Sequence, residues 1–311
     1  MKKNSLFLFY FYLTTCNANV IIENYIPFFS TVTDQAGYSF IALRTFTMSN
    51  DALYLVVDPE TMKTKLVPQS EMKEAVPLKH SRYQAALIHT TSAPWPLQNQ
   101  GVQHATTPSS GSAFLTVDLC PSSKSFDENF FTRLIASHPS SPFPLGISVS
   151  GLWMVNHEKE FQWLQSQQKN NHLDITWINH TWHHYYVRGK ENSSNFLLLP
   201  GTDVYFEIIE NEKALLSRKE IPSVFIRFPG LISDRKIVET VSKLGLIPTG
   251  ADAWLAKGQQ IYDGSVVLVH GNGNEPLGLR MLTDSLLTTI QWLPLSQVFD
   301  DQPMAQRMNN Q

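Results

Sequence analysis

Residues 113–118 have the sequence AFLTVD, an apolar run that ends on a carboxylate before the chain turns at Pro121. A short apolar run bounded by turn residues is typical of a strand buried on both faces. Farther along the chain, similar runs alternate with segments of helical periodicity. Strands that alternate with helices predict a parallel sheet, either open or closed into a barrel, so we expect an α/β fold here.

The alternation continues over most of the chain that follows. We expect strands at residues 113–117, 145–150, 175–178, 204–209, 224–227 and 266–270. We expect helices at residues 127–138, 158–167 and 234–244, with Ser233 as the N-cap of the last. In folds of this kind, catalytic groups collect where strands end. The first residues to consider are therefore those that follow the apolar runs.

The chain before residue 113 has a different pattern. Short strands are expected at residues 40–46, 53–57 and 63–67, with a turn at 58–60. We therefore predict a small β-rich module over residues 19–90. Residues 91–112 are rich in Pro, Gly, Ser and Thr without apolar periodicity, which indicates a linker. The main domain is expected over residues 113–300, with a C-terminal tail at 301–311.

The composition is typical of a folded protein, and its small net charge suits an uncharged substrate better than a polyanion. The 311 residues are 42% hydrophobic and 16% charged, enough for one large core or for a core and a smaller module. The formal net charge is -3, and no stripe of Lys and Arg interrupts the mixed sequence. A dominant electrostatic attraction to nucleic acid is therefore not expected.

The N-terminus has the order of a secretory signal peptide. Lys2 and Lys3 precede an apolar run at residues 6–13, and the small residue Ala18 follows. We expect residues 1–18 to be removed and the protein to be exported, either to a periplasm or out of the cell. The apolar run is shorter than the roughly 20 residues that span a bilayer. A buried N-terminal strand is the alternative interpretation.

The two cysteines also bear on this region. Cys16 follows Leu-Thr-Thr in a loose likeness of a lipoprotein signal, a second alternative to simple cleavage. After removal of residues 1–18, Cys120 is the only cysteine, so no disulfide can form within the chain. The fold must then be held by its core.

Two histidines indicate a metal site. His180 and His184 come directly after the predicted strand at residues 175–178. If the chain turns into a helix here, they lie on one face, a spacing that lets two imidazoles hold one divalent ion. A third ligand is still required, and an isolated pair of this kind is as often the polar start of a helix.

Three other residues end apolar runs. Asp118 suits a general base, although an Asp in this position can also merely cap a turn. Arg227 could pair with Asp118 and orient it, or form an ordinary surface salt bridge. His270 suits a general acid, although a lone His beside an apolar run is more often structural.

The order of these segments resembles that of the NodB-like polysaccharide deacetylases, the chitin deacetylase family of carbohydrate esterases. Residues 115–121 (LTVDLCP) resemble the family's Thr-Phe-Asp-Asp-Gly-Pro, and residues 180–184 (HTWHH) its His-Ser/Thr-x-x-His. Residues 227–230 (RFPG) resemble its Arg-x-Pro, 251–254 (ADAW) its Asp/Trp segment and 268–270 (LVH) its Leu-x-His. The resemblance covers residues 113 to about 280, over half of the chain.

The resemblance implies a distorted (β/α) barrel with a divalent metal, usually zinc, held by His180, His184 and an Asp. It implies that Asp118 is the base that activates water and that Arg227 holds Asp118 in place. It also implies that His270 protonates the departing amine.

For the pocket, the resemblance implies that Trp254 and Pro229 contact substrate and that Asp252 orients His270. Two departures loosen these assignments. Leu119 stands where the family has its metal-binding second Asp, and Gly230 follows Arg-x-Pro where an aromatic residue is frequent.

Cys120 needs an interpretation of its own, because it follows Asp118 so closely. A thiol ligand or a nucleophile must be considered. We interpret Cys120 instead as a small buried hydrophobe, which is common for free cysteine.

The expected function is removal of N-acetyl groups from N-acetylglucosamine units of peptidoglycan, a chitin-like polymer or an exopolysaccharide. Export agrees with this, because such polymers lie outside the cytoplasm. Two alternatives remain open: a non-catalytic glycan-binding protein on the same fold, suggested by Leu119, and a hydrolase of another small amide.

Overall fold

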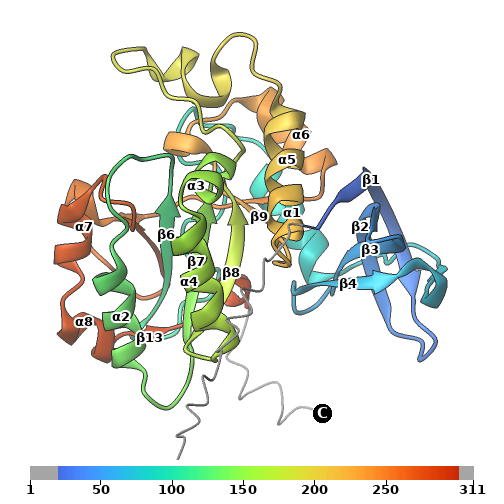
Figure 1. Ribbon diagram of the computed structural model, residues 1–311, viewed down its shortest axis with the longest axis horizontal. Helices are drawn as coiled ribbons and strands as arrows, with labels where there is room; N and C mark the ends of the chain where they lie inside the picture. Colours follow the sequence, from blue (N-terminus) through green and yellow to red (C-terminus); the bar gives the residue numbers. More distant parts are fainter. Residues whose placement is uncertain (1–19, 301–311) are drawn as a thin grey trace, which may run out of the picture.

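The computed structural model describes residues 20–300 (Figure 1). The predicted signal peptide, including Cys16, and the predicted tail at residues 301–311 lie outside the described residues. Two sheets organise the chain: an antiparallel sheet near the N-terminus and a larger parallel sheet after it. In the part of the chain that the structure describes, no helix combines the length and apolarity needed to cross a membrane.

The N-terminal module is a five-stranded antiparallel sheet in the order β4-β3-β2-β1-β5. Its elements are β1 (Ile22–Thr33), β2 (Ser39–Met48), β3 (Asp51–Val57), β4 (Thr64–Pro68), η1 (Gln69–Glu71), β5 (Lys73–Glu74) and α1 (Arg82–Thr91). The strands expected at residues 40–46, 53–57 and 63–67 correspond to β2, β3 and β4.

The second sheet is parallel, in the order β10-β9-β8-β7-β6-β12-β11, with β13 added beside β6. Its strands are β6 (Ser112–Leu119), β7 (Phe143–Val149), β8 (Leu173–Asn179), β9 (Phe225–Ile226), β10 (Ile247–Pro248), β11 (Ala253–Trp254), β12 (Ser265–His270) and β13 (Gln291–Trp292). Every residue of the central strand β6 is buried, as its apolar sequence predicts. A curled parallel sheet preceded by a β module confirms the predicted fold class.

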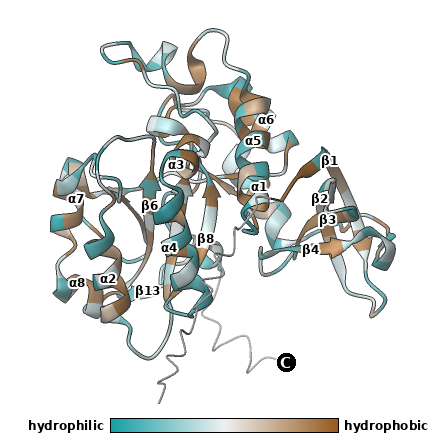
Figure 2. Cartoon of the chain, viewed as in Figure 1, coloured by the Kyte–Doolittle hydropathy of each residue, from teal (hydrophilic) through white to brown (hydrophobic). Residues whose placement is uncertain are grey.

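Helices follow most of the parallel strands and cover the sheet (Figure 1). They are α2 (Glu128–Ser137), α3 (Gly151–Asn156), α4 (Glu158–Lys169), α5 (Val204–Ser217), α6 (Arg235–Lys243), α7 (Pro276–Met281) and α8 (Asp284–Thr289). Short 3-10 turns lie at η2 (Asn192–Ser194), η3 (Phe196–Leu198), η4 (Pro229–Leu231), η5 (Leu255–Lys257) and η6 (Leu295–Gln297). Figure 2 shows hydrophobic strands behind helices with hydrophilic outer faces.

Two local predictions are wrong. Residues 204–209 are not a strand but the first half of α5, whose N-terminus is capped by the Asp203 side chain accepting from the Phe206 amide. A short apolar run cannot distinguish a strand from a buried helix segment. The helix after β9 is capped by Asp234, which accepts from the Ile237 amide, rather than by Ser233.

Part of the predicted linker is built into the larger domain. Gln98 forms an isolated bridge with Ile232, Val102 with Thr249, and His104 with Ser265. This segment therefore bridges the end of β10, at one edge of the sheet, and the start of β12, near the other edge.

A buried ion pair fixes the module to the larger domain. Arg44 on β2 donates from Nε to Oε2 of Glu212 on α5 at 2.8 Å and from Nη2 to Oε1 at 2.9 Å. Tyr25 on β1 donates to the same carboxylate at 2.8 Å. Both ionised side chains are 1% exposed. Because a bidentate buried pair fixes both distance and angle, the module has a defined seat beside α5.

Candidate active site

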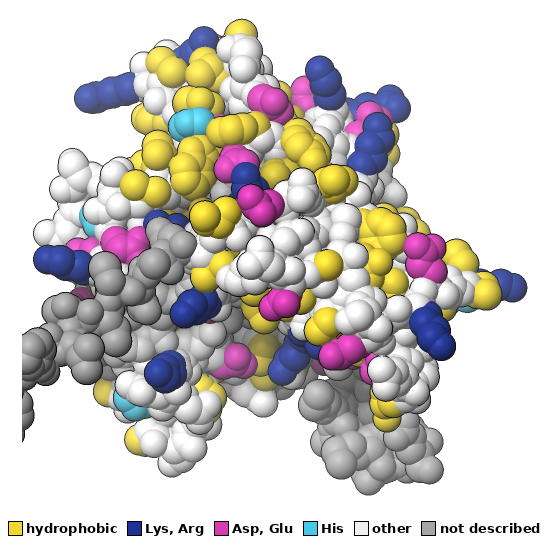
Figure 3. Space-filling view, turned by 45° about the vertical axis from the view of Figure 1, so that its right-hand side comes forward, with side chains coloured by type: hydrophobic (Ala, Val, Ile, Leu, Met, Phe, Trp, Pro, Cys, Tyr) yellow, Lys and Arg dark blue, Asp and Glu magenta, His cyan; other side chains and the backbone are white. Residues whose placement is uncertain are grey.

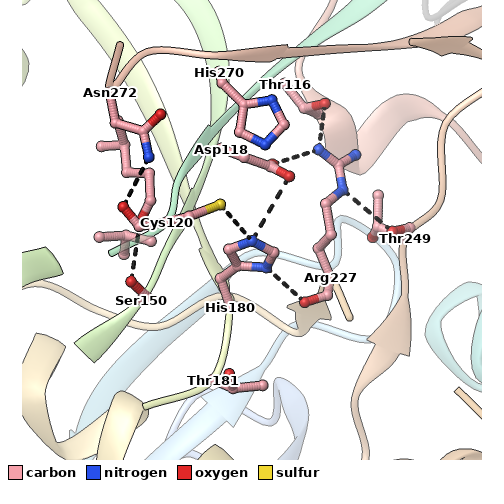
Figure 4. Close-up of polar contacts among 12 residues, drawn as sticks. Thr116, Asp118, Cys120, Ser150, His180, Thr181, Arg227, Thr249, His270 and Asn272 are labelled. Carbon is pink, nitrogen blue, oxygen red and sulfur yellow. Dashed lines mark hydrogen bonds and ion pairs between the residues drawn. The ribbon is translucent and has the colours of Figure 1, made fainter. Parts of the chain in front are cut away.

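The carboxyl ends of the parallel strands deliver the polar groups to one edge of the sheet. Asp118 lies next to the end of β6, opposite His270 at the end of β12. His180 follows β8, and Arg227 follows β9. Figure 4 shows these four side chains pointing toward one another. A cavity of about 470 Å³ opens here, and its lining includes Asp118, Cys120, His180, His184, Trp254 and His270.

Arg227 holds Asp118 from behind. Its Nη1 donates to Oδ1 of Asp118 at 2.8 Å and to Oγ1 of Thr116 at 2.7 Å. Its remaining donors reach the carbonyls of Thr249 at 3.3 Å and Gly250 at 2.9 Å. Arg227 is fully buried and donates four hydrogen bonds to these acceptors, one of them to a carboxylate, so its charge is compensated and its position fixed.

Asp118 is ionised in this setting. Burial alone raises the pKa of the carboxyl, but the positive charges of Arg227, His180 and His270 outweigh it and lower the pKa to about 2. The other carboxylate oxygen, Oδ2, lies 3.7 Å from Nε2 of His180. A permanently charged, oriented carboxylate therefore faces the cavity.

His180 and His184 meet through a loop, not through the helix considered from the sequence. Thr181 and His184 have φ values of 65° and 50°, which interrupt any helix. The two rings still lie 4.6 Å apart between centroids. Nδ1 of His180 lies 2.8 Å from the carbonyl oxygen of Arg227 and donates to it, which leaves Nε2 directed at the cavity.

Cys120 is the third donor of this group. Its Sγ lies 3.5 Å from Nε2 of His180, and the donor atoms of Cys120, His180 and His184 all lie within 4.8 Å of one another. Burial raises the pKa of the thiol, but His184, His270 and His180 outweigh burial and hold the pKa well below its ordinary value. Cys120 is buried, as expected, and it also lines the cavity.

These side chains fit a divalent metal. Nε2 of His184 is buried and has no hydrogen-bond partner among the described residues, an arrangement that costs free energy unless something binds there. Imidazole nitrogen and thiolate sulfur are donors that zinc accepts. The backbone bond on His180 also matches the outer-shell contact that orients a metal-binding imidazole.

His270 is held by an acid that the sequence did not single out. Nδ1 of His270 lies 2.9 Å from Oε2 of Glu275, and the same oxygen accepts from Nε1 of Trp254 at 2.7 Å. Burial lowers the pKa of His270, but Cys120, Glu275 and Asp118 together raise it well above its ordinary value. These neighbouring charges favour the protonated form of His270. An acid in the polar turn after an apolar run ending in His was the available sequence signal.

Asp252, expected to orient His270, lies elsewhere. Its Oδ2 lies 2.6 Å from Nδ1 of His104 and accepts from Oγ of Ser265 at 3.3 Å. The reason is the register of β11, which places Trp254 opposite Leu268 and leaves Asp252 near the start of β12. The carboxylate beside His270 is that of Glu275, and this part of the expected site is corrected.

The two residues that were expected to contact substrate, Trp254 and Pro229, differ in their positions relative to the cavity. Trp254 lines the cavity, as expected. Pro229 is buried in η4, and the next two residues, Gly230 and Leu231, line the cavity instead. The ring of Phe196 fits against Gly230, where a Cβ would come within 2.5 Å of it.

An aromatic rim surrounds the opening. Tyr186 and Phe196 line the cavity with Trp254. Beyond them, exposed apolar side chains continue over the loop and the start of α5, and these are Tyr185, Tyr186, Val187, Tyr205 and Phe206. Figure 3 shows hydrophobic side chains gathered at the top of the molecule, where Figure 1 places this loop, while charges of both signs are mixed over the rest of that face.

One family model matches the N-terminal part. Residues 23–91 match the model described as the RP012 protein N-terminal domain. This range covers nearly all of the antiparallel sheet and α1. The N-terminal module is therefore similar to a known domain family, and the description of that family names no activity.

Several solved structures resemble the chain at low identity. A family 4 carbohydrate esterase from Bacillus anthracis is 13% identical, with a TM-score of 0.48. The match covers 72% of this chain and 94% of the esterase chain. The chitin deacetylase of the fungal pathogen Colletotrichum lindemuthianum is also 13% identical, with 68% and 95% coverage and a TM-score of 0.47. BA3943, a family 4 pseudoenzyme from Bacillus anthracis, is 10% identical, with 92% coverage of both chains and a TM-score of 0.45.

The first two are described as a family 4 carbohydrate esterase and a chitin deacetylase, and all three are similar to this chain only at low identity. No activity of this chain follows from likenesses at this level.

Proposed function

We propose that this chain is a metal-dependent hydrolase that removes N-acetyl groups from a polysaccharide containing N-acetylglucosamine. One observation carries the proposal: Asp118 and His270 line the same cavity as the imidazoles of His180 and His184. The surrounding charges favour the ionised form of Asp118 and the protonated form of His270. Hydrolysis of an amide needs a base for the attacking water and an acid for the departing amine.

The residues divide this work by their charge states. Asp118 accepts the proton of the attacking water, and Arg227 keeps that carboxylate charged and oriented. His270 donates a proton to the departing nitrogen, and Glu275 keeps His270 protonated and aimed. A divalent metal, with zinc the best fit, would be held by His180 and His184 and would supply a positive charge for the developing oxyanion.

The substrate class is supported by the surroundings of the cavity. Apolar faces of sugar rings pack well on aromatic side chains, and Trp254, Tyr186 and Phe196 provide such faces at the opening. The face in Figure 3 carries no field of one sign that would select a polyanion. The predicted export would bring the enzyme to peptidoglycan, a chitin-like polymer or an exopolysaccharide, and it remains part of the proposal.

Acetate release tests the proposal. Purified protein should release acetate from N-acetylglucosamine oligomers or peptidoglycan, and a chelator should stop the release until zinc is restored. Failure to release acetate from any of these glycans, with metal bound, would contradict the proposal. Retained glycan binding in that case would favour a non-catalytic binding protein.

A further inference from the structure

We infer that Cys120 is the third protein ligand of the metal, so that the ion rests on one thiolate and two imidazoles. The site would therefore select zinc and other thiophilic cations over magnesium, calcium or manganese. This inference rests on the proposed function only in assuming that a metal binds between His180 and His184.

The separation of the donors matches such an ion. Zinc bonds of about 2.3 Å to sulfur and about 2.05 Å to nitrogen, at a tetrahedral angle, place the two donors about 3.5 Å apart. The observed distance from Sγ of Cys120 to Nε2 of His180 is 3.5 Å. The nitrogen of His184 completes a triangle in which no two donors are more than 4.8 Å apart. An ion can therefore contact all three with small side-chain adjustments.

The backbone holds Cys120 in this position. Its carbonyl oxygen accepts from Nδ2 of Asn272 at 2.7 Å, and Asn272 is fully buried. The carbonyl of Leu119 accepts from Oγ of Ser150 at 3.1 Å. These two contacts, visible in Figure 4, fix the turn that follows β6 and aim Sγ into the cavity. A fixed ligand loses little conformational entropy when a metal binds.

The preceding residue cannot serve. Leu119 has no donor atom, is fully buried and belongs to the apolar core of the larger domain. Within the described chain, the grouping of donors consists of Cys120, His180 and His184. An imidazole must be neutral to bind the ion, so ligation by His180 would release its proton. One anionic sulfur with two neutral imidazoles would then leave a bound dication with one net positive charge. Hard cations prefer oxygen donors, whereas sulfur favours zinc and softer ions.

A nucleophilic role for Cys120 is the competing interpretation, because the thiol also contacts His270, which Glu275 orients. A nucleophilic thiol would need only His270 as its partner, so the placement of His180 and His184 beside the sulfur would have no explanation. A nucleophilic role would also leave Nε2 of His184 buried without a partner. Metal ligation by Cys120 accounts for all three donors at once.

Cobalt(II) substitution provides a direct test. The full chain loaded with cobalt(II) should show a sulfur-to-cobalt charge-transfer band in the near ultraviolet. Cys120→Ser should abolish the band and weaken zinc binding by more than the roughly 10–100-fold that is typical of an outer-shell change. Ser122→Ala, on the same turn but outside the donor group, is the matched control and should keep both properties.

A second variant keeps the inference falsifiable if Cys120→Ser folds poorly. Cys120→Asp supplies an oxygen donor from the same turn, so it should lose the band and shift the relative affinity from zinc toward manganese. The inference would be overturned if the native chain bound cobalt without showing the band. It would also be overturned if Cys120→Ser bound zinc as tightly as the native chain does. Full activity after chelation together with inactivation by alkylation of Cys120 would likewise overturn it, because this result would assign a nucleophile.

These outcomes are distinguishable from failure of the proposed function. A charge-transfer band without acetate release would support the ligand and contradict deacetylation. Acetate release that depends on metal, without the band, would do the reverse.

Discussion

Arg227 and Asp118, which are 109 residues apart in the chain, form a buried ion pair with a distance of 2.8 Å between Nη1 and Oδ1. The pair joins the end of β6 to the residue that follows β9, and thus connects two strands that are separated in the sheet by β7 and β8. The pair supplies the carboxylate that is proposed as the catalytic base. It also links two strands of the parallel sheet through a polar contact.

The variant Asp118→Asn should lose nearly all activity. A positioned base contributes about 10²- to 10⁴-fold to the rate, and an amide cannot accept the proton. Metal content should stay near that of the native chain, since the donors are other residues. Acetate release and metal analysis on the same preparation check both statements. Asp252→Asn, whose carboxylate lies beside His104, is the control and should stay active.

The same pair predicts a pH dependence of stability. The pKa of Asp118 is about 2 in the folded chain against an ordinary value of 3.8, so the folded state favours the charged form. Its contribution is therefore complete above about pH 4 and is lost as the pH falls through about 2. The difference between the two values is equivalent to about 2 kcal/mol.

Urea unfolding between pH 5 and pH 2 checks this dependence. The free energy of unfolding of the native chain should approach that of Asp118→Asn as the pH falls. A gap between the two that stays constant over this range would show that Asp118 has an ordinary pKa in the folded chain.

Glu275→Gln should shift the pH profile of catalysis. Glu275 helps to raise the pKa of His270, so the loss of its charge should lower that pKa. The alkaline limb of kcat/KM should then move to lower pH, with metal content unchanged. A purely structural role for Glu275 would lower activity at every pH without moving the limb, and Asp252→Asn should leave it in place.

Arg44→Met should loosen the module from the larger domain. The change leaves Glu212 charged and buried without its main partner, which costs about 3–5 kcal/mol in comparable pairs. Chemical denaturation checks the loss. Arg235→Met, which removes an exposed pair with Glu239, should cost less than about 1 kcal/mol. Equal losses in the two variants would mean that the buried pair contributes nothing special.

The parallel sheet and most of the cavity could be predicted from the sequence because both depend on local patterns. Apolar runs that end in Asp118, Arg227 or His270 place these residues at one sheet edge whatever the loops do. The helix at residues 204–209 was missed because a short apolar run suits either structure. Its capping residue, Asp203, was the missed indication.

Glu275 and Cys120 could not be assigned in advance for a different reason. Their roles depend on how two turns, after β6 and after β12, fold against each other. Asn272 makes that contact by donating to the carbonyl of Cys120. Distances between turns are not encoded in the periodicity of either segment. The register of β11, which moves Asp252 away from His270, is likewise set by strand pairing and not by spacing in the sequence.

The central claim is that Asp118, His180, His184 and His270 form one catalytic centre. The most direct measurement compares acetate release and bound zinc for the native chain, His184→Ala and His270→Ala on one N-acetylglucosamine oligomer. We predict that both variants lose activity, that His184→Ala also loses zinc, and that His270→Ala keeps it. Full activity in either variant, or equal loss of zinc from both, would contradict this account.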